Sequence, residues 1–284
     1  NYADDLARVI DETLAKGGNL VIPSFAVGRT QELLYFIREI KEQGLVDCDP
    51  DFQVYVDSPL AGAATEIFSG DLTGYLDEEA VEHLRGGALF RFPGLNITES
   101  TEESRELNLD ARPKVIISAS GMCDAGRIRH HLKHNLWRPE STILFVGYQA
   151  EGSLGRRILD GASHVKLFGE EISVRARIVR FHGLSSHADR DGLVRWINNY
   201  TPKPQQVFVV HGEARAAENY AQTLTELGFS AHAPNYEEVY DLLEDRMIAP
   251  GIAIEPKPAP VDPGSPAYRR LEDVGRKLME VIAH

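Results

Sequence analysis

The chain has 284 residues, of which 43% are hydrophobic and 26% charged, enough apolar material for one or two globular domains. Its formal net charge of −13 disfavours broad attraction to a polyanion, so any nucleic-acid binding has to be local, in a cleft with its own positive field. The two cysteines lack C-x-x-C spacing and no apolar run approaches the ~20 residues of a membrane-spanning helix, which predicts a cytoplasmic protein without membrane contact, disulfides or thiolate zinc sites.

The first part of the chain alternates helical and strand patterns. Apolar spacing predicts a helix over 3–16, which a Gly-Gly pair ends, and a strand over 19–25. A second helix begins at 28–30, where backbone N–H groups beside Arg29 could seat an anion. A plain strand-to-helix turn is the commoner use of such a short motif. Because the chain opens in a helical pattern and without methionine, we expect a fragment.

A strand predicted over 52–56 ends at Asp57. A carboxylate in this position could be a ligand or a base, but a turn or helix cap is the commoner use, and we predict a cap. Residues 61–68 and 78–85 have helical patterns, whereas 86–111 contains short mixed segments that the sequence does not place.

A buried strand predicted over 114–118 runs into the small-residue loop 119–127. Such a loop lets backbone approach a phosphate closely, and Arg127 at its end adds positive charge. The loop has neither the Gly-Lys-Ser/Thr ending of a P-loop nor a G-x-G-x-x-G pattern. The loop therefore indicates anion binding but matches no nucleotide-binding motif.

Three histidines, His130, His131 and His134, lie on the helix after this loop. His130 and His134 share a face and could hold a metal. No third ligand lies nearby in the sequence, so surface or partly packed histidines are the favoured interpretation.

A third strand-loop-helix unit begins with a strand over 142–146 and continues through the loop 147–153. Three such units with short loops predict an α/β fold with a mainly parallel sheet flanked by helices on both faces.

The pattern changes after residue 161. Segments 164–168 and 172–181 predict an antiparallel hairpin at a domain boundary. Farther on, His187 and His211 each follow an apolar, strand-like run, positions where α/β proteins place their chemistry. They indicate phosphate or metal handling, with hydrogen-bonded core histidines as the alternative.

The remaining segments complete a smaller unit. We expect a helix through Leu193, Trp196 and Ile197, a strand over 206–210, a helix over 214–227 and a strand over 239–243. A Pro-rich linker over 256–266 then leads to an amphipathic helix over 269–282, which docks on this chain or on a partner.

Six segments of the chain occur together in one order. They are Ile22–Glu32, Asp57–Ala61, Ser118–Arg127, Gly147–Gly155, Ser185–Asp189 and Val210–Glu213. Together they resemble the metallo-β-lactamase-fold RNA-processing nucleases of the β-CASP family, which includes the cleavage-and-polyadenylation endonucleases and bacterial relatives. The resemblance implies a β-CASP domain over 1–163, the C-terminal part of a metallo-β-lactamase αββα fold over 164–250, and a Pro-rich linker with a C-terminal helix over 251–284.

Complete members of this family begin with the first half of the metallo-β-lactamase domain, which carries a His-x-His-x-Asp-His motif. That motif is absent from this sequence. The resemblance therefore implies a fragment whose N-terminal zinc-ligand half is missing. The complete protein would hold two zinc ions and be a metal-dependent hydrolase, whereas this fragment would hold none stably and be inactive alone.

The activity implied by the resemblance is zinc-dependent hydrolysis of phosphodiester bonds in single-stranded RNA, with endonuclease and exonuclease modes both open. His211 matches a zinc ligand, His187 the histidine that contacts the scissile phosphate, and Ser185 a phosphate-binding serine. Asp189 would cap the following helix or orient His187.

The resemblance also implies that RNA lies in a cleft between the two domains. Its backbone would meet Arg29, Arg127 and the loop of Ser120 and Gly121, contacts that need no particular base sequence. The partners expected are single-stranded RNA and the missing N-terminal half, and a homodimer stays open.

Two other functions compete with this one. A non-catalytic RNA-binding or scaffold member of the same fold would have lost its metal ligands, but it would need neither His187 nor His211. An unrelated nucleotide-binding α/β domain would explain the repeated loops, but the phosphate-loop motifs are missing.

Overall fold

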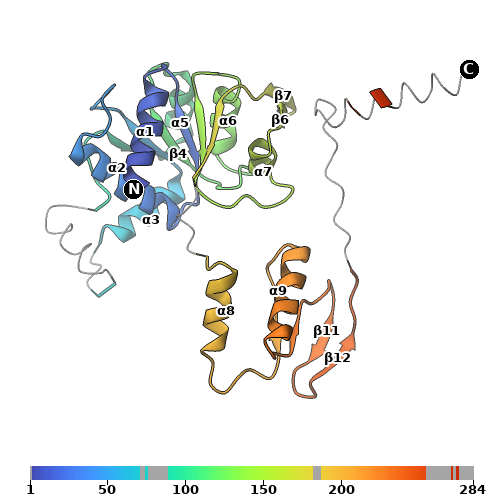
Figure 1. The fold of residues 1–284 in the computed structure, drawn as a ribbon. Coiled ribbons are helices and arrows are strands. Elements are labelled where there is room, and N and C mark those ends of the chain that lie inside the picture. Colours follow the sequence, from blue (N-terminus) through green and yellow to red (C-terminus); the bar gives the residue numbers. More distant parts are fainter. Residues whose placement is uncertain are drawn as a thin grey trace, which may run out of the picture. The chain divides into compact units, whose positions relative to one another are not determined.

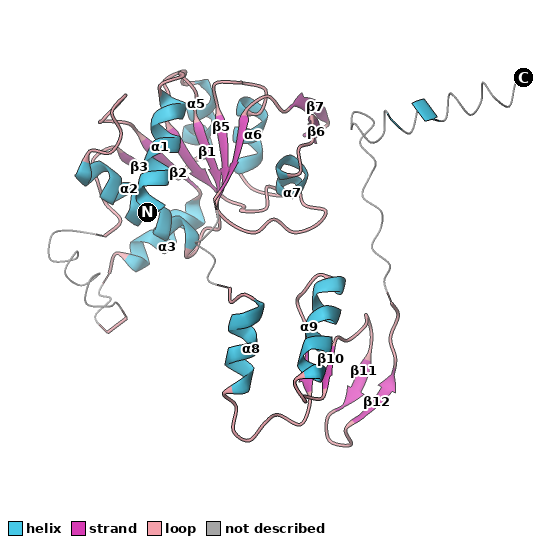
Figure 2. Ribbon diagram, viewed as in Figure 1, coloured by secondary structure: helices cyan, strands magenta, loops and turns pink. Residues whose placement is uncertain are grey.

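The computed structural model describes residues 2–70, 74–75, 89–181, 187–253, 270 and 273–274. These residues form two compact units: 2–181, 270 and 273–274 belong to the first and 187–253 to the second (Figures 1 and 2). In the described part of the chain, no helix is both long and apolar enough to cross a bilayer.

The first unit is an α/β domain. Its helices are α1 (Tyr2–Leu14), α2 (Arg29–Gln43), α3 (Pro59–Phe68), α5 (Thr101–Leu109), α6 (Ile128–Asn135) and α7 (Leu154–Leu159). Its strands are β1 (Leu20–Pro23), β2 (Val54–Asp57), β3 (Leu95–Ile97), β4 (Val115–Ser118), β5 (Thr142–Phe145), β6 (His164–Leu167), β7 (Glu170–Ser173) and β8 (Arg177–Arg180).

Six of these strands form one parallel sheet in the order β3-β2-β4-β1-β5-β8. In its centre, Leu20 of β1 is in register with Val115 of β4 on one side and Thr142 of β5 on the other. The central strands β1, β4 and β5 are buried along their whole length, as parallel strands covered on both faces are. The predicted mainly parallel sheet flanked by helices is confirmed.

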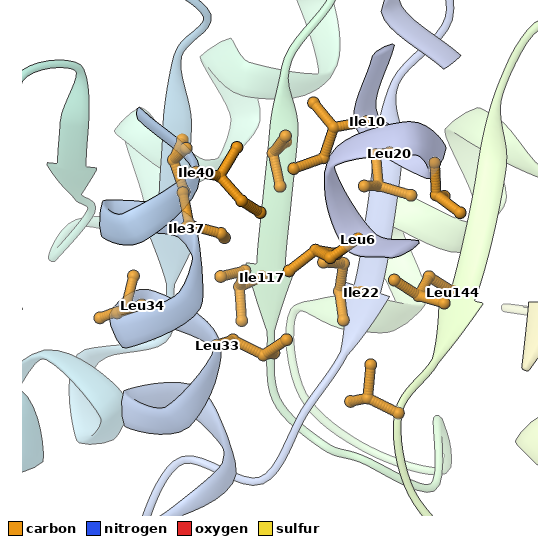
Figure 3. Packing of buried hydrophobic residues seen from close by; sticks show 14 of the residues in the cluster. Leu6, Ile10, Leu20, Ile22, Leu33, Leu34, Ile37, Ile40, Ile117 and Leu144 are labelled. Carbon is orange, nitrogen blue, oxygen red and sulfur yellow. The ribbon is translucent and has the colours of Figure 1, made fainter. Parts of the chain in front are cut away.

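Apolar side chains cover both faces of this sheet. On one face, Leu6 and Ile10 of α1 and Leu33 and Ile37 of α2 point toward the strands (Figure 3). On the other face, α6 and α7 pack Ile128, Leu132 and Ile158 against β1 and β5. Each fully buried Leu or Ile contributes about 1.5–3 kcal/mol, so the two layers fix the sheet firmly.

The segment 172–181, predicted as one strand, is two. The predicted hairpin is confirmed between β6 and β7, but the chain then turns, because the backbone N–H groups of Arg175 and Ala176 both donate to Leu136 O. The following strand, β8, pairs in parallel with β5. The first unit therefore extends through Phe181.

The second unit has short elements and a small core. They are α8 (Arg190–Asn198), β9 (Val207–Phe208), α9 (Ala214–Glu226), β10 (Ala231–His232), β11 (Val239–Asp241) and β12 (Arg246–Ala249). Strands β9 and β10 pair in parallel, and β11 and β12 pair as an antiparallel hairpin. The cluster of Ile197, Leu224 and Phe229 is its core.

The sequence missed several short elements. Helix α5 begins with a capping box between Ser100 and Glu103, which is a local signal inside the stretch 86–111, for which the sequence predicts no structure. The expected helix over 78–85 and the linker over 256–266 lie outside the described residues, as does nearly all of the helix expected over 269–282.

Candidate functional site

The connections after β1 and β4 meet at the carboxyl edge of the sheet. These strands are neighbours, but β1 leads through α2 to β2, whereas β4 leads through α6 to β5, and the two helices cover opposite faces. A Cβ atom on Gly121 would lie 3.1 Å from the Phe25 ring, so the two connections are in contact. The connections from these two neighbouring strands thus run in opposite directions along the sheet. In open parallel sheets, ligands bind outside the carboxyl ends of the strands at the point where this direction reverses.

Arg29, Ser120, Gly121 and Arg127 all belong to these two connections. The structure therefore brings four of the expected RNA-contacting residues to one region of the first unit. Ser185 lies outside the described residues.

The loop around Ser120 is closed by its own hydrogen bonds. The backbone N–H of Ser120 donates to Ala125 O at 3.2 Å, and that of Cys123 donates to Ser120 O at 3.2 Å. Gly126 has φ +81°, and a Cβ atom there would lie 2.3 Å from Ala119 O, so only glycine fits. The loop presents a fixed, small-residue surface, with Gly121 buried against the neighbouring connection.

Arg29 opens α2 and lies against that helix. Its Nη1 donates to Glu32 Oε2 at 2.5 Å, and 14% of its side chain is exposed. The N–H of Gly28, the residue before the helix, donates to Gln31 Oε1 at 2.7 Å. This N-terminus is thus partly satisfied by its own first turn, and Glu32 offsets part of the charge of Arg29, so both attract an anion less than an unpaired helix N-terminus would.

Arg127 is held by hydrogen bonds to residues that follow β2 and β3. Its Nη1 donates to Asp57 Oδ1 at 2.8 Å, and its Nη2 donates to Glu99 O at 2.9 Å. About a fifth of the side chain, 21%, remains exposed. The guanidinium is therefore already oriented before a ligand binds, and the Asp57 carboxylate offsets part of its positive charge.

Asp57 is the centre of a buried polar network and not a helix cap, so that prediction was wrong. Ser58 caps α3 by accepting a hydrogen bond from the Ala61 N–H. The Asp57 carboxylate instead accepts hydrogen bonds from buried donors on three segments. They are Thr98 Oγ1 at 2.5 Å, Ser104 Oγ at 2.6 Å and His131 Nε2 at 2.6 Å.

Burial of Asp57 acts to raise its pKa, but the hydrogen bonds from His131, Ser104 and Thr98 outweigh this effect. They hold the pKa of the carboxyl well below its usual range. Asp57 is therefore ionised and fixes Arg127 beside the loop.

His131 is neither a surface histidine nor a partly packed one, although the sequence favours these two interpretations. Its side chain is fully buried, with Nε2 on Asp57 and Nδ1 2.9 Å from Asn108 Oδ1. His130 and His134 are exposed, and His130 stacks on Phe168 with ring centroids 4.4 Å apart. The sequence signal for His131 is its position in the helix. His130 and His134 share one face of α6, whereas His131 is one residue further along and so lies on another face, which is buried.

In the second unit, His187 and His211 are both exposed. His211 follows β9 in a left-handed conformation with φ +63°, which turns its side chain out of the strand direction. Asp189, two residues after His187, accepts a hydrogen bond from the Gly192 N–H at 2.7 Å and caps α8, as one of its two expected roles required.

A zinc ion needs three or four protein ligands. Within the described ranges, no group of three or more His, Cys, Asp or Glu side chains is arranged to hold a metal. The exposed imidazole of His211 fits one position of a zinc site, and the other ligands would have to come from residues beyond those described.

Comparison with known proteins gives two domain matches. Residues 30–158 match the Beta-Casp domain, and residues 171–234 match the Zn-dependent metallo-hydrolase RNA specificity domain. A ribonuclease of Thermus thermophilus is 38% identical over 210 residues, which cover 74% of this chain and 46% of that protein.

Two archaeal proteins are also similar. The transcription termination factor FttA of Methanothermobacter thermautotrophicus is 33% identical over 217 residues, 74% of this chain and 33% of that protein. An RNase J-like protein of Methanocaldococcus jannaschii is 32% identical over 219 residues, 77% of this chain and 49% of that protein. The chain thus spans less than half the length of these relatives.

Proposed function

The chain belongs to the β-CASP family of metallo-β-lactamase-fold RNA-processing nucleases, and from this premise we propose that it is part of a zinc-dependent ribonuclease acting on single-stranded RNA. The observation that carries the proposal is the succession of the two matched domains, with His187 and His211 both inside the second. A scaffold protein without chemistry would need neither histidine.

His211 is proposed to supply one imidazole to a zinc site that the rest of the protein completes. Zinc, when bound, lowers the pKa of water and so supplies hydroxide at neutral pH. His187 is proposed to contact the scissile phosphate, where its imidazole steadies developing charge or protonates the leaving oxygen. Ser185 would donate its hydroxyl to a phosphate oxygen.

The first unit would bind the RNA backbone through Arg29, Arg127 and the loop of Ser120 and Gly121. Support comes from their common place at the reversal of strand order and from the fixed orientation of Arg127 on Asp57. Arginine and small-residue backbone contact phosphates without reading bases, so this chain would show weak sequence preference.

We further propose that the second unit is completed by the N-terminal half of the metallo-β-lactamase domain. Support comes from apolar side chains that its small core leaves exposed. They are Leu193, Trp196, Val210, Leu243 and Ile248, among others. The free thiols Cys48 and Cys123 support a place in the reducing cytoplasm.

The test is zinc content by mass spectrometry together with cleavage of a single-stranded RNA, on this chain and on the full-length gene product. We expect about two zinc ions and cleavage in the longer protein alone. There, His211→Ala should lose zinc and activity, whereas His187→Ala should keep zinc and slow cleavage by about 10²-fold or more.

His134→Ala is the matched control, because His134 is exposed on α6 and outside the proposed chemistry. A full-length protein without zinc and without cleavage would move the chain to the scaffold function. If the 284-residue chain cleaves the RNA and its His187→Ala variant does not, cleavage does not require the N-terminal half of the metallo-β-lactamase domain.

A further inference from the structure

A cavity of about 270 Å³ lies at the carboxyl ends of β5 and β8 in the first unit. It is lined by Tyr148, Gln149, Arg156, Leu159, Asp160 and Arg180. None of these residues has a role in the function proposed above. The volume lies just below the ~300–1,000 Å³ of small-molecule sites, so the cavity has room for a ligand of about one nucleotide.

The charges in this cavity favour an anion. Two arginines face one aspartate, in a chain whose net charge is −13. Arg156 Nε donates to both carboxylate oxygens of Asp160 at 2.9 Å. Arg180 is exposed, and its side chain makes no hydrogen bond or ion pair with any residue in the described part of the chain. Its guanidinium is therefore available to a phosphate.

Tyr148 adds an aromatic surface beside these charges. It lies in the loop after β5 and is 53% exposed. An aromatic ring next to a guanidinium is the pairing with which proteins bind single-stranded nucleic acid, the base stacking on the ring and the phosphate meeting the cation. A pocket for inorganic phosphate alone would have no use for the ring.

Gln149 joins the cavity to the loop of the candidate site. Its side chain is 3% exposed, and its Nε2 donates to Gly121 O at 2.9 Å. The cavity therefore adjoins the loop of Ser120 and Gly121, and an RNA strand that contacts this loop can extend into the cavity toward β5 and β8.

We propose that this cavity binds one nucleotide of the RNA strand, with the base stacked on Tyr148 and a phosphate paired with Arg180. Arg156 lies in the same lining in an ion pair with Asp160, so the net positive charge of the cavity is that of Arg180. The inference rests on the proposed function, because it takes RNA as the ligand, and it adds a subsite away from the reacting phosphate.

The experiment measures binding by the 284-residue chain of a fluorescein-labelled single-stranded RNA of about ten nucleotides, by fluorescence anisotropy at several salt concentrations. Tyr148→Leu should raise the Kd roughly 5- to 150-fold, the usual effect of removing a stacking ring. Tyr148→Phe, which keeps the ring, should bind like the wild type. Arg180→Ala should lower the slope of log affinity against log salt by about 0.7, one phosphate contact.

Arg112→Ala is the matched control. It removes the same charge from a side chain that is 79% exposed just before β4, at the amino edge of the sheet. Its Kd and salt slope should equal those of the wild type. Thermal unfolding of each variant separates a local loss of binding from a loss of fold.

Three results would overturn the inference. If Tyr148→Leu and Arg180→Ala bind as the wild type does, RNA does not use the cavity, although cleavage by the full-length protein would still support the proposed function. If the wild-type chain fails to bind the RNA, the inference also fails, because residues 2–181 contain the whole lining. If uridine monophosphate binds and the RNA does not, the cavity serves a free nucleotide.

Discussion

Asp57 holds three hydrogen-bond donors and one guanidinium on a single buried carboxylate. The change Asp57→Asn would remove the charge that Arg127 and His131 face, and would place an amide group among donors. We expect it to lower the free energy of unfolding by about 3–5 kcal/mol, the usual cost of breaking a buried pair. Urea unfolding of the 284-residue chain at neutral pH measures this loss.

The control for Asp57 is Asp5→Asn, which breaks a surface pair with the exposed Arg8 on α1. It should cost less than about 1 kcal/mol. Because the pKa of Asp57 is lowered in the folded state, its stabilisation is present above the unfolded pKa of about 4 and is lost as pH falls toward the folded pKa. The gap between wild type and Asp57→Asn should therefore narrow below about pH 4, and a gap that widened would refute this account.

The position of Asp57 was visible in the sequence, but its function was not. Its partners come from the segments 98–104 and 127–131, the first of which had no predicted structure. Convergence of distant side chains depends on how α5 and α6 pack, and no local pattern records it. Capping by Asp189 was predicted because a cap involves only residues within the next turn.

Among the elements, the connection from β4 to α6 depends on one glycine. Gly126 has φ +81°, and a Cβ atom there would lie 2.3 Å from a backbone oxygen. We expect Gly126→Ala to destabilise the chain by about 2–4 kcal/mol, the sum of left-handed strain and a backbone shift. Gly17→Ala is the control, because Gly17 has φ +77° but open space around its Cβ position, and should cost about 1 kcal/mol. Equal losses in urea unfolding would show that the close contact adds nothing.

The central strands were predictable because they are continuous apolar runs between short loops. Runs such as 114–118 and 142–146 are buried on both faces, and their burial does not depend on an exact neighbour. The sequence predicted strand for 172–181 but did not divide it into β7 and β8, which the turn at Leu136 O separates, and it did not predict β10, which has two residues. Elements this short are defined by their partners, and the partners are far away in the sequence.

On the scale of the whole molecule, the two units differ in how much apolar surface they bury. The first has a hydrophobic cluster on each face of its sheet. The second has the cluster of Ile197, Leu224 and Phe229, while Trp196 is 58% and Leu243 is 96% exposed. Regions with few buried apolar contacts open at low free energy, so the second unit should be the less protected part of this chain.

Hydrogen exchange tests this difference together with the proposed missing half. In the 284-residue chain, amides of α8 and α9 should exchange much faster than those of β1, β4 and β5. In the full-length gene product, α8 and α9 should gain at least about tenfold in protection, or about 1.4 kcal/mol, because their apolar side chains become covered. Amides of β4 are the internal control, since that strand is already buried here and should not change. Equal protection of α8 and α9 in both proteins would mean that the second unit is complete by itself, and that its exposed apolar side chains do not pack on the rest of the protein.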